Sequence, residues 1–116
     1  MNEETSMDQL FLENVHKAIE NNLANESFGV DELALEIGLS RSQLHRKLQL
    51  LTGQSASEMI KEFRLNKAKK MLQNNVATAS EISYQVGFSS PSYFNTCFKE
   101  YFGYSPGKLK KRLEYP

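Results

Sequence analysis

The sequence predicts an all-α fold of about seven helices, in which two helix-turn-helix units are joined by one long central helix. No segment alternates strictly between apolar and polar residues, as a half-buried strand would. The stretch Glu32–Ser40 returns 49 positions later as Glu81–Ser89, with most of its apolar positions, its glycine and its final serine kept. A short helix, a glycine turn and a second helix, repeated in one chain, indicate a duplicated helix-turn-helix.

The repeat continues beyond the glycine turn, at an offset of 50 residues and over about 25 residues per copy. The added residue lies near Ser90 and Pro91. The corresponding pairs are Leu44 and Phe94, Leu48 and Phe98, Gly53 and Gly103, and Ser55 and Ser105.

The first predicted helix covers about Asp8–Ala24 and follows residues 1–7, which we expect to be disordered or a linker. It opens a first subdomain of residues 8–53. Its inward residues recur at the spacing of one helix face, and they are Phe11, Val15, Ala18, Ile19, Asn22 and Leu23.

Two shorter helices complete the first copy. Asp31–Ile37 ends at Gly38, because glycine takes the left-handed conformation of a helix end without steric cost. Ser40 is the expected N-cap of the next helix, which runs to about Leu51, and Gln43 completes its capping box. The expected inward residues are Leu33, Ala34, Ile37, Leu44, Leu48 and Leu51.

The connecting segment, residues 54–74, predicts a long helix that begins after Ser55 and ends near Gln73. Glu58 stands three residues after Ser55, as the partner in a capping box does. Its apolar residues recur at helical spacing, and they are Met59, Ile60, Phe63, Ala68, Met71 and Leu72.

The second subdomain, residues 75–113, begins with Thr78 as N-cap and Glu81 as its box partner. Its first helix buries Ile82 together with Tyr84 or Val86. The remaining two helices each start with a serine followed by a proline, a residue suited to the first helical position. These starts are Ser90-Pro91, before a helix that buries Phe94, Phe98 and Phe102, and Ser105-Pro106, before a basic helix that runs through Lys108, Lys110, Lys111 and Arg112.

The charge is divided along the chain although the formal net charge is zero. Residues 1–36 hold nine acids and one base, for a net charge of −8, while residues 37–116 hold thirteen bases and five acids, for +8. The acidic segment is screened beyond roughly 8 Å at physiological salt, so a polyanion would meet the basic part at short range.

The residue inventory argues against several classes of protein. His16, His45 and the lone Cys97 have no metal-ligand spacing, and no nucleophile arrangement or phosphate-binding glycine pattern occurs. We therefore expect no metal, no cofactor and no enzymatic activity, and a half-buried thiol at Cys97. No apolar run is long enough to span a membrane and no signal peptide is evident, which favours a cytoplasmic protein without membrane contact in this segment.

The helix after Gly38 carries the pattern of a nucleic-acid reader. Opposite its leucines, its exposed face presents donors at helical spacing, and arginine is the side chain best shaped to bridge O6 and N7 of guanine. Such a face fits a major groove. Its residues are Arg41, Ser42, His45, Arg46 and Gln49.

The chain resembles the AraC/XylS-type DNA-binding domain over about residues 8–112. The residues that carry the resemblance are Leu33-Ala34, Gly38–Leu48, Thr52-Gly53, Arg64-Leu65, Ala68, Leu72, Glu81-Ile82, Val86–Phe88, Pro91–Phe94, Phe98-Lys99 and Phe102–Pro106.

The resemblance implies that two helix-turn-helix units enter successive major-groove segments of double-stranded DNA. The implied base contacts are Ser42, His45 and Arg46, with Arg41, Gln43 and Lys47 beside them, and, in the second copy, Pro91, Ser92, Asn95 and Thr96. Family members often have an arginine where this chain has Thr96, so we expect less direct base recognition from the second copy.

Phosphate contacts are expected from helix N-termini and from basic side chains. Arg64 could instead have a structural role in the connecting helix, and the sequence leaves both alternatives open. The phosphate candidates are Ser40, Ser90, Ser105, Pro91, Lys47, Lys61, Arg64, Lys99 and the cluster Lys108–Arg112.

Family members usually pair this domain with a sensory or dimerisation domain, for which this chain has no room. The stretch Ser40–Leu48 with Thr52–Ser55 looks most like the output domain of response regulators and hybrid sensor kinases. The family habit implies an activator of transcription, with RNA polymerase as a further partner. A stand-alone short regulator is an alternative. A second alternative is a helical module whose basic face binds an acidic protein. Exposure distinguishes it from a DNA-binding domain, which should expose Arg46 and His45 and bury the aromatic residues of the second copy.

Overall fold

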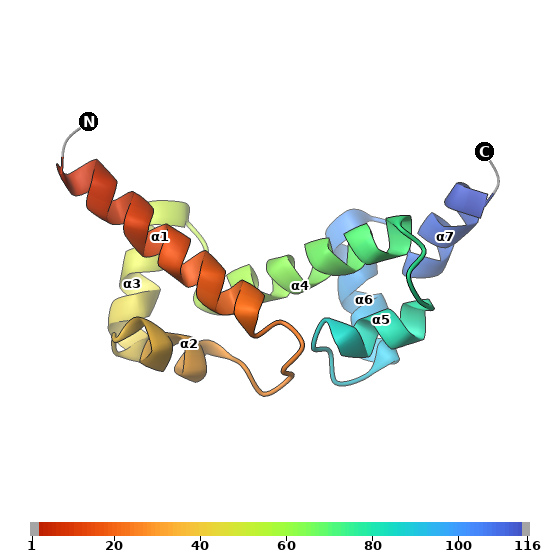
Figure 1. The fold of residues 1–116 in the computed structure, drawn as a ribbon, viewed down its shortest axis with the longest axis horizontal. Helices are drawn as coiled ribbons and strands as arrows, with labels where there is room; N and C mark the ends of the chain where they lie inside the picture. The colour runs from red at the N-terminus through yellow and green to blue at the C-terminus, as the bar shows by residue number, and fades with distance from the viewer. Residues whose placement is uncertain (1–2, 115–116) are drawn as a thin grey trace. The chain divides into compact units, whose positions relative to one another are not determined.

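The computed structural model describes residues 3–114, which form seven helices and no strand (Figure 1). The all-α prediction is confirmed. The helices are α1 (Glu3–Asn21), α2 (Val30–Ile37), α3 (Arg41–Thr52), α4 (Ala56–Gln73), α5 (Ala79–Gln85), α6 (Pro91–Phe102) and α7 (Pro106–Glu114).

The described residues divide into two compact units. The first contains residues 3–22 and 28–61, and the second contains residues 23–27 and 62–114. The division falls within α4, whose early residues Met59 and Ile60 and later residues Leu65 and Leu72 are all buried. One helix thus contributes core residues to both units.

The first unit is built from α1, α2, α3 and the start of α4. Helix α1 begins at Glu3, before the expected start at Asp8. The earlier start was not predicted because the first turn lacks the apolar residues that indicate a helix in a sequence. It ends at Asn21, and the Asn22 side chain donates to the carbonyl of Ala18 at 2.7 Å. The buried residues include Val15, Ile19, Leu33, Leu44 and Leu48, all with no exposed area.

The second unit has an aromatic core. The ring of Phe94 lies 5.2 Å from that of Phe88 and 5.6 Å from that of Phe98, between centroids. Of the two alternatives predicted for this part of the chain, Val86, which directly follows α5, is buried, while Tyr84 within α5 is 54% exposed. Cys97, expected to be half-buried, is only 4% exposed and belongs to this core.

The repeat seen in sequence is a repeat in backbone geometry. Helices α3 and α6 each have twelve residues, a serine N-cap and a glycine C-cap. The four glycines that recur between the copies all have positive φ, from 73° to 91°. No helix within residues 3–114 has both the length and the apolarity needed to cross a membrane.

Candidate nucleic-acid interface

Helix α3 presents one buried and one exposed face. Leu44 and Leu48 are fully buried, while Ser42, His45, Arg46 and Gln49 are exposed on the other side of the helix. Its start is fixed by a capping box, in which the Ser40 hydroxyl accepts from the Gln43 N–H at 3.1 Å and the Ser40 N–H donates to Gln43 Oε1 at 2.9 Å. Packing and capping thus hold the polar face outward on a rigid element.

An open groove of about 650 Å³ runs along this face within the first unit. The structure brings four of the predicted site residues of α3 together there, beside the first residues of α2 and α4. The lining residues are Val30, Arg41, Ser42, His45, Arg46, Ser55, Ala56 and Ser57.

The start of α4 also lines this groove, which the sequence did not predict. Ser55 was expected only as a cap, and its hydroxyl does accept from the Glu58 N–H at 3.1 Å. The capping serine could have indicated a phosphate-binding position, because the N-terminus of a helix carries partial positive charge that attracts anions. The groove therefore combines arginine side chains with the positive end of an 18-residue helix.

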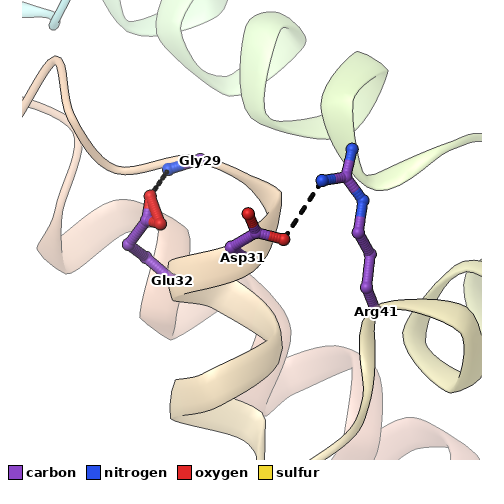
Figure 2. A network of polar contacts seen from close by, with 4 residues as sticks. All are labelled: Gly29, Asp31, Glu32 and Arg41. Carbon is purple, nitrogen blue, oxygen red and sulfur yellow. Dashed lines mark hydrogen bonds and ion pairs between the residues drawn. The ribbon is translucent and has the colours of Figure 1, made fainter.

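Two residues at the start of α3, Arg41 and Gln43, have partners within the first unit. Arg41 Nη1 lies 3.1 Å from Oδ1 of Asp31 on α2 (Figure 2). The side chains of Arg41 and Asp31 are 68% and 70% exposed. The side-chain oxygen Oε1 of Gln43 accepts from the Ser40 N–H in the cap of α3. The structure thus gives Gln43 a local structural contact at the position where the family resemblance implies a base contact.

Two other phosphate candidates of the first unit lie elsewhere. The ammonium of Lys47 lies 4.3 Å from the centroid of the Phe11 ring, against α1, where it makes a cation–π contact. Lys61 is exposed on α4. Neither residue lines the groove beside α3.

In the second unit, α6 exposes an uncharged face at the equivalent positions. Ser92, Asn95 and Thr96 are exposed, and the Thr96 hydroxyl donates to the carbonyl of Ser92 at 3.2 Å. Ser90 caps the helix through the Tyr93 N–H at 3.1 Å, with Pro91 at the first helical position. Lys99 is exposed on the next turn.

The basic helix α7 begins at Pro106, and the hydroxyl of the preceding Ser105 accepts from the Lys108 N–H at 3.1 Å. The Lys110 ammonium donates to the carbonyl of Ala77 at 3.0 Å, which ties α7 to the segment before α5. The side chains of Lys111 and Arg112 lie outside the described residues.

Arg64 has the structural role that the sequence left open. Its guanidinium donates to the carbonyls of Gly87 at 3.0 Å and Asn25 at 2.9 Å, all within the second unit. Burial lowers the pKa of Arg64 from its ordinary value, while the nearby Glu26 raises it. A Cβ at Gly87 would meet the carbonyl oxygen of Leu23 and the Arg64 guanidinium.

The exposure pattern is the one expected of a DNA reader. His45 and Arg46 point outward, whereas Phe94 and Phe98 are fully buried. The second unit also exposes three tyrosines, which are Tyr84, Tyr93 and Tyr101, at 54%, 50% and 44% exposure. Among the described residues, no group of three or more His, Cys, Asp or Glu side chains could hold a metal ion.

The chain matches a known family of proteins. A family model described as a helix-turn-helix domain matches residues 33–112. Histidine kinase P4 of Formosa agariphila is 40% identical over 108 residues, which cover 93% of this chain and 8% of that protein. The chain spans between 8% and 64% of the length of the first curated relatives that it matches.

Two solved structures resemble the fold closely. An AraC-type regulator from Chromobacterium violaceum has a TM-score of 0.84 and 28% identity, over 96% of this chain and 98% of the other. The C-terminal domain of the two-component response regulator yesN from Fusobacterium nucleatum has a TM-score of 0.79 and 28% identity, over 84% and 95%. The chain belongs to the AraC-type helix-turn-helix family of DNA-binding transcriptional regulator domains.

Proposed function

We propose that this domain binds double-stranded DNA sequence-specifically through the groove face of α3, as the output domain of a longer two-component regulator. The observation that carries the proposal is the open groove, in which Arg41, His45 and Arg46 of α3 meet the N-terminus of α4. This surface offers base-reading donors and phosphate-binding groups side by side.

Base recognition rests on three side chains of α3. Arg46 is long enough to bridge O6 and N7 of a guanine in the major groove, while His45 and Ser42 donate to neighbouring base edges. All three are exposed and line the groove. Because Leu44 and Leu48 anchor the opposite face in the core, the reading side chains are presented with little backbone freedom.

Phosphates of the same DNA segment would be bound beside them. Ser55, Ala56 and Ser57 at the start of α4 line the groove, and the positive end of this helix suits one phosphate. Lys61 lies further along α4 and Ser40 at the start of α3, so both remain candidates for adjacent phosphates.

The second unit adds a weaker reader. Asn95 can pair with N6 and N7 of adenine, and Ser92 and Thr96 offer hydroxyls, but the face of α6 lacks an arginine at these positions. Lys99 and the N-termini at Ser90 and Ser105 supply phosphate contacts. We infer that this unit mainly fixes register and responds to DNA shape.

The two-component assignment is supported by the relatives. One is a histidine kinase of which this domain matches 8%, and another is the C-terminal domain of a response regulator. The same proposal includes a sensory or dimerisation domain elsewhere in the protein, a cytoplasmic location, and RNA polymerase as the partner of an activator.

Selection of bound duplexes from a random library tests the proposal. We expect an enriched motif, and Arg46→Ala should weaken binding to it by about 1–3 kcal/mol and relax one base position. Lys17→Ala, which removes one positive charge from α1, is the matched control and should leave the motif unchanged. Absence of any enriched motif, or an intact motif and affinity in Arg46→Ala, would contradict the proposal and favour a module that binds acidic proteins.

A further inference from the structure

We propose that Asp31 is an internal counterion for Arg41 that restrains the sequence-independent DNA affinity of the α3 groove. The inference rests on the proposed function, since it concerns the strength of the same DNA contact. It assigns a role in DNA binding to an acidic residue of α2, the helix that precedes the reading helix.

The geometry places the two side chains at the edge of the groove. Arg41 is the first residue of α3 and lines the groove, and its Nη1 atom lies 3.1 Å from Oδ1 of Asp31 (Figure 2). A carboxylate and a phosphate present similar oxygen acceptors to a guanidinium. Asp31 therefore occupies a donor of Arg41 that a DNA phosphate would otherwise use.

The carboxylate stands on a fixed backbone. Asp31 is in the first turn of α2, where a helix favours negative charge. The turn is closed by the N–H of Gly29, which donates to Glu32 Oε1 at 3.0 Å, also drawn in Figure 2. Glu32 is thereby directed to the cap, while Asp31 is directed to Arg41.

The ion pair can be displaced by DNA. Both side chains are largely exposed, at 68% and 70%, and ion pairs in such surroundings are weak. A phosphate can therefore replace the carboxylate, but only by separating Arg41 from Asp31. Binding to random sequence depends almost wholly on phosphate contacts, so this competition lowers the affinity for competing DNA in general.

The experiment measures the affinity of Asp31→Asn for a random-sequence duplex over a range of salt concentrations. We expect binding about two- to fivefold tighter at low salt, the strength of one exposed ion pair. The dependence of log affinity on log salt should steepen by up to about 0.9, the contribution of one phosphate contact. Asp31→Ser, which also suits the first turn of a helix, provides a second variant if Asp31→Asn is poorly folded.

Two controls separate a local contact from a general charge effect. Glu20→Gln removes the same charge from an exposed position of α1 that neither lines the groove nor pairs with Arg41. It should change the affinity by less than about 1.5-fold, because exposed charges are screened by salt. In an Arg41→Ala background, Asp31→Asn should have no effect. Equal effects of Asp31→Asn and Glu20→Gln, or an effect that persists without Arg41, would overturn the inference.

The outcome is distinguishable from failure of the proposed function. A wild-type chain that binds no duplex at any salt concentration would refute both. A wild-type chain that selects a motif, with Asp31→Asn unchanged in affinity and salt dependence, would refute only the role of Asp31.

Discussion

Arg64 on α4 donates a hydrogen bond of 3.0 Å to the carbonyl of Gly87, the turn residue of the second helix-turn-helix. The same guanidinium holds Asn25, so one side chain organises two backbone segments of the second unit. We expect Arg64→Ala to destabilise this unit by about 1.5–3 kcal/mol, because hydrogen bonds from a charged donor are lost. Arg64→Lys should restore only part of the lost stability, because the lysine ammonium lacks the planar guanidinium that donates to two carbonyls at once. Urea denaturation measures both, and a loss below about 0.5 kcal/mol in Arg64→Ala would argue against this role.

The equivalent glycines of the two turns should respond differently to the same substitution. Gly38 and Gly87 have φ of 85° and 91°, so alanine is strained at either by about 1–2 kcal/mol. A Cβ at Gly38 meets no atom within 4 Å, whereas at Gly87 it meets the Leu23 carbonyl. Gly87→Ala should therefore be clearly the more destabilising, as measured by chemical denaturation. Equal losses would show that the second turn can relax.

The capping box of α5 should make stability depend on pH. The side chain and backbone N–H of Thr78 both donate to Glu81 and lower its pKa below the ordinary 4.5, with a further contribution from Lys110. This stabilisation is fully present above pH 4.5 and is lost as the pH falls through the lowered pKa. Denaturation at several pH values should show Glu81→Gln less stable than wild type at neutral pH, with the difference shrinking in acid. Glu20→Gln controls for the loss of one charge; a difference that does not change with pH would contradict this account.

The two reading helices should contribute unequally to sequence recognition. Arg46→Ala should lose one sharply defined base, whereas Ser92→Ala should change the motif little, because a single serine hydroxyl discriminates weakly between bases. Thr96→Arg adds a guanidinium at a position where family members often have one and should sharpen a base preference in the second half of the site. Selection from randomised duplexes measures all three, and two equally sharp half-sites in the wild type would refute the inequality.

Much of the fold was predictable because its signals are local. The serine caps, the four repeated glycines and the apolar spacing mark the ends and inner faces of the helices, and a family resemblance supplied the rest of the plan. The start of α1 could not be predicted, because helical periodicity is recognised from apolar residues and the first turn has none. The exclusive burial of Val86 rather than Tyr84 depends on packing against α4 and α6, which no local pattern records.

The candidate site was predictable only in part. The exposed face of α3 follows from the spacing of its leucines, so Ser42, His45 and Arg46 could be named in advance. The partners of Arg41 and Arg64 could not, because Asp31 and Gly87 lie 10 and 23 residues away in the chain. The place of Ser57 in the groove could not be predicted either, because it depends on the position of the start of α4 relative to α3.

The matched ends of α3 and α6 have a consequence for altering the domain. Both helices have twelve residues, begin after a serine and end at a glycine with φ of 73° and 84°. Their outward positions can therefore be exchanged while the caps and buried residues stay in place. A chain whose α6 carries the outward residues of α3 should keep its fold and recognise a site in which the base preferences of the first half recur in the second.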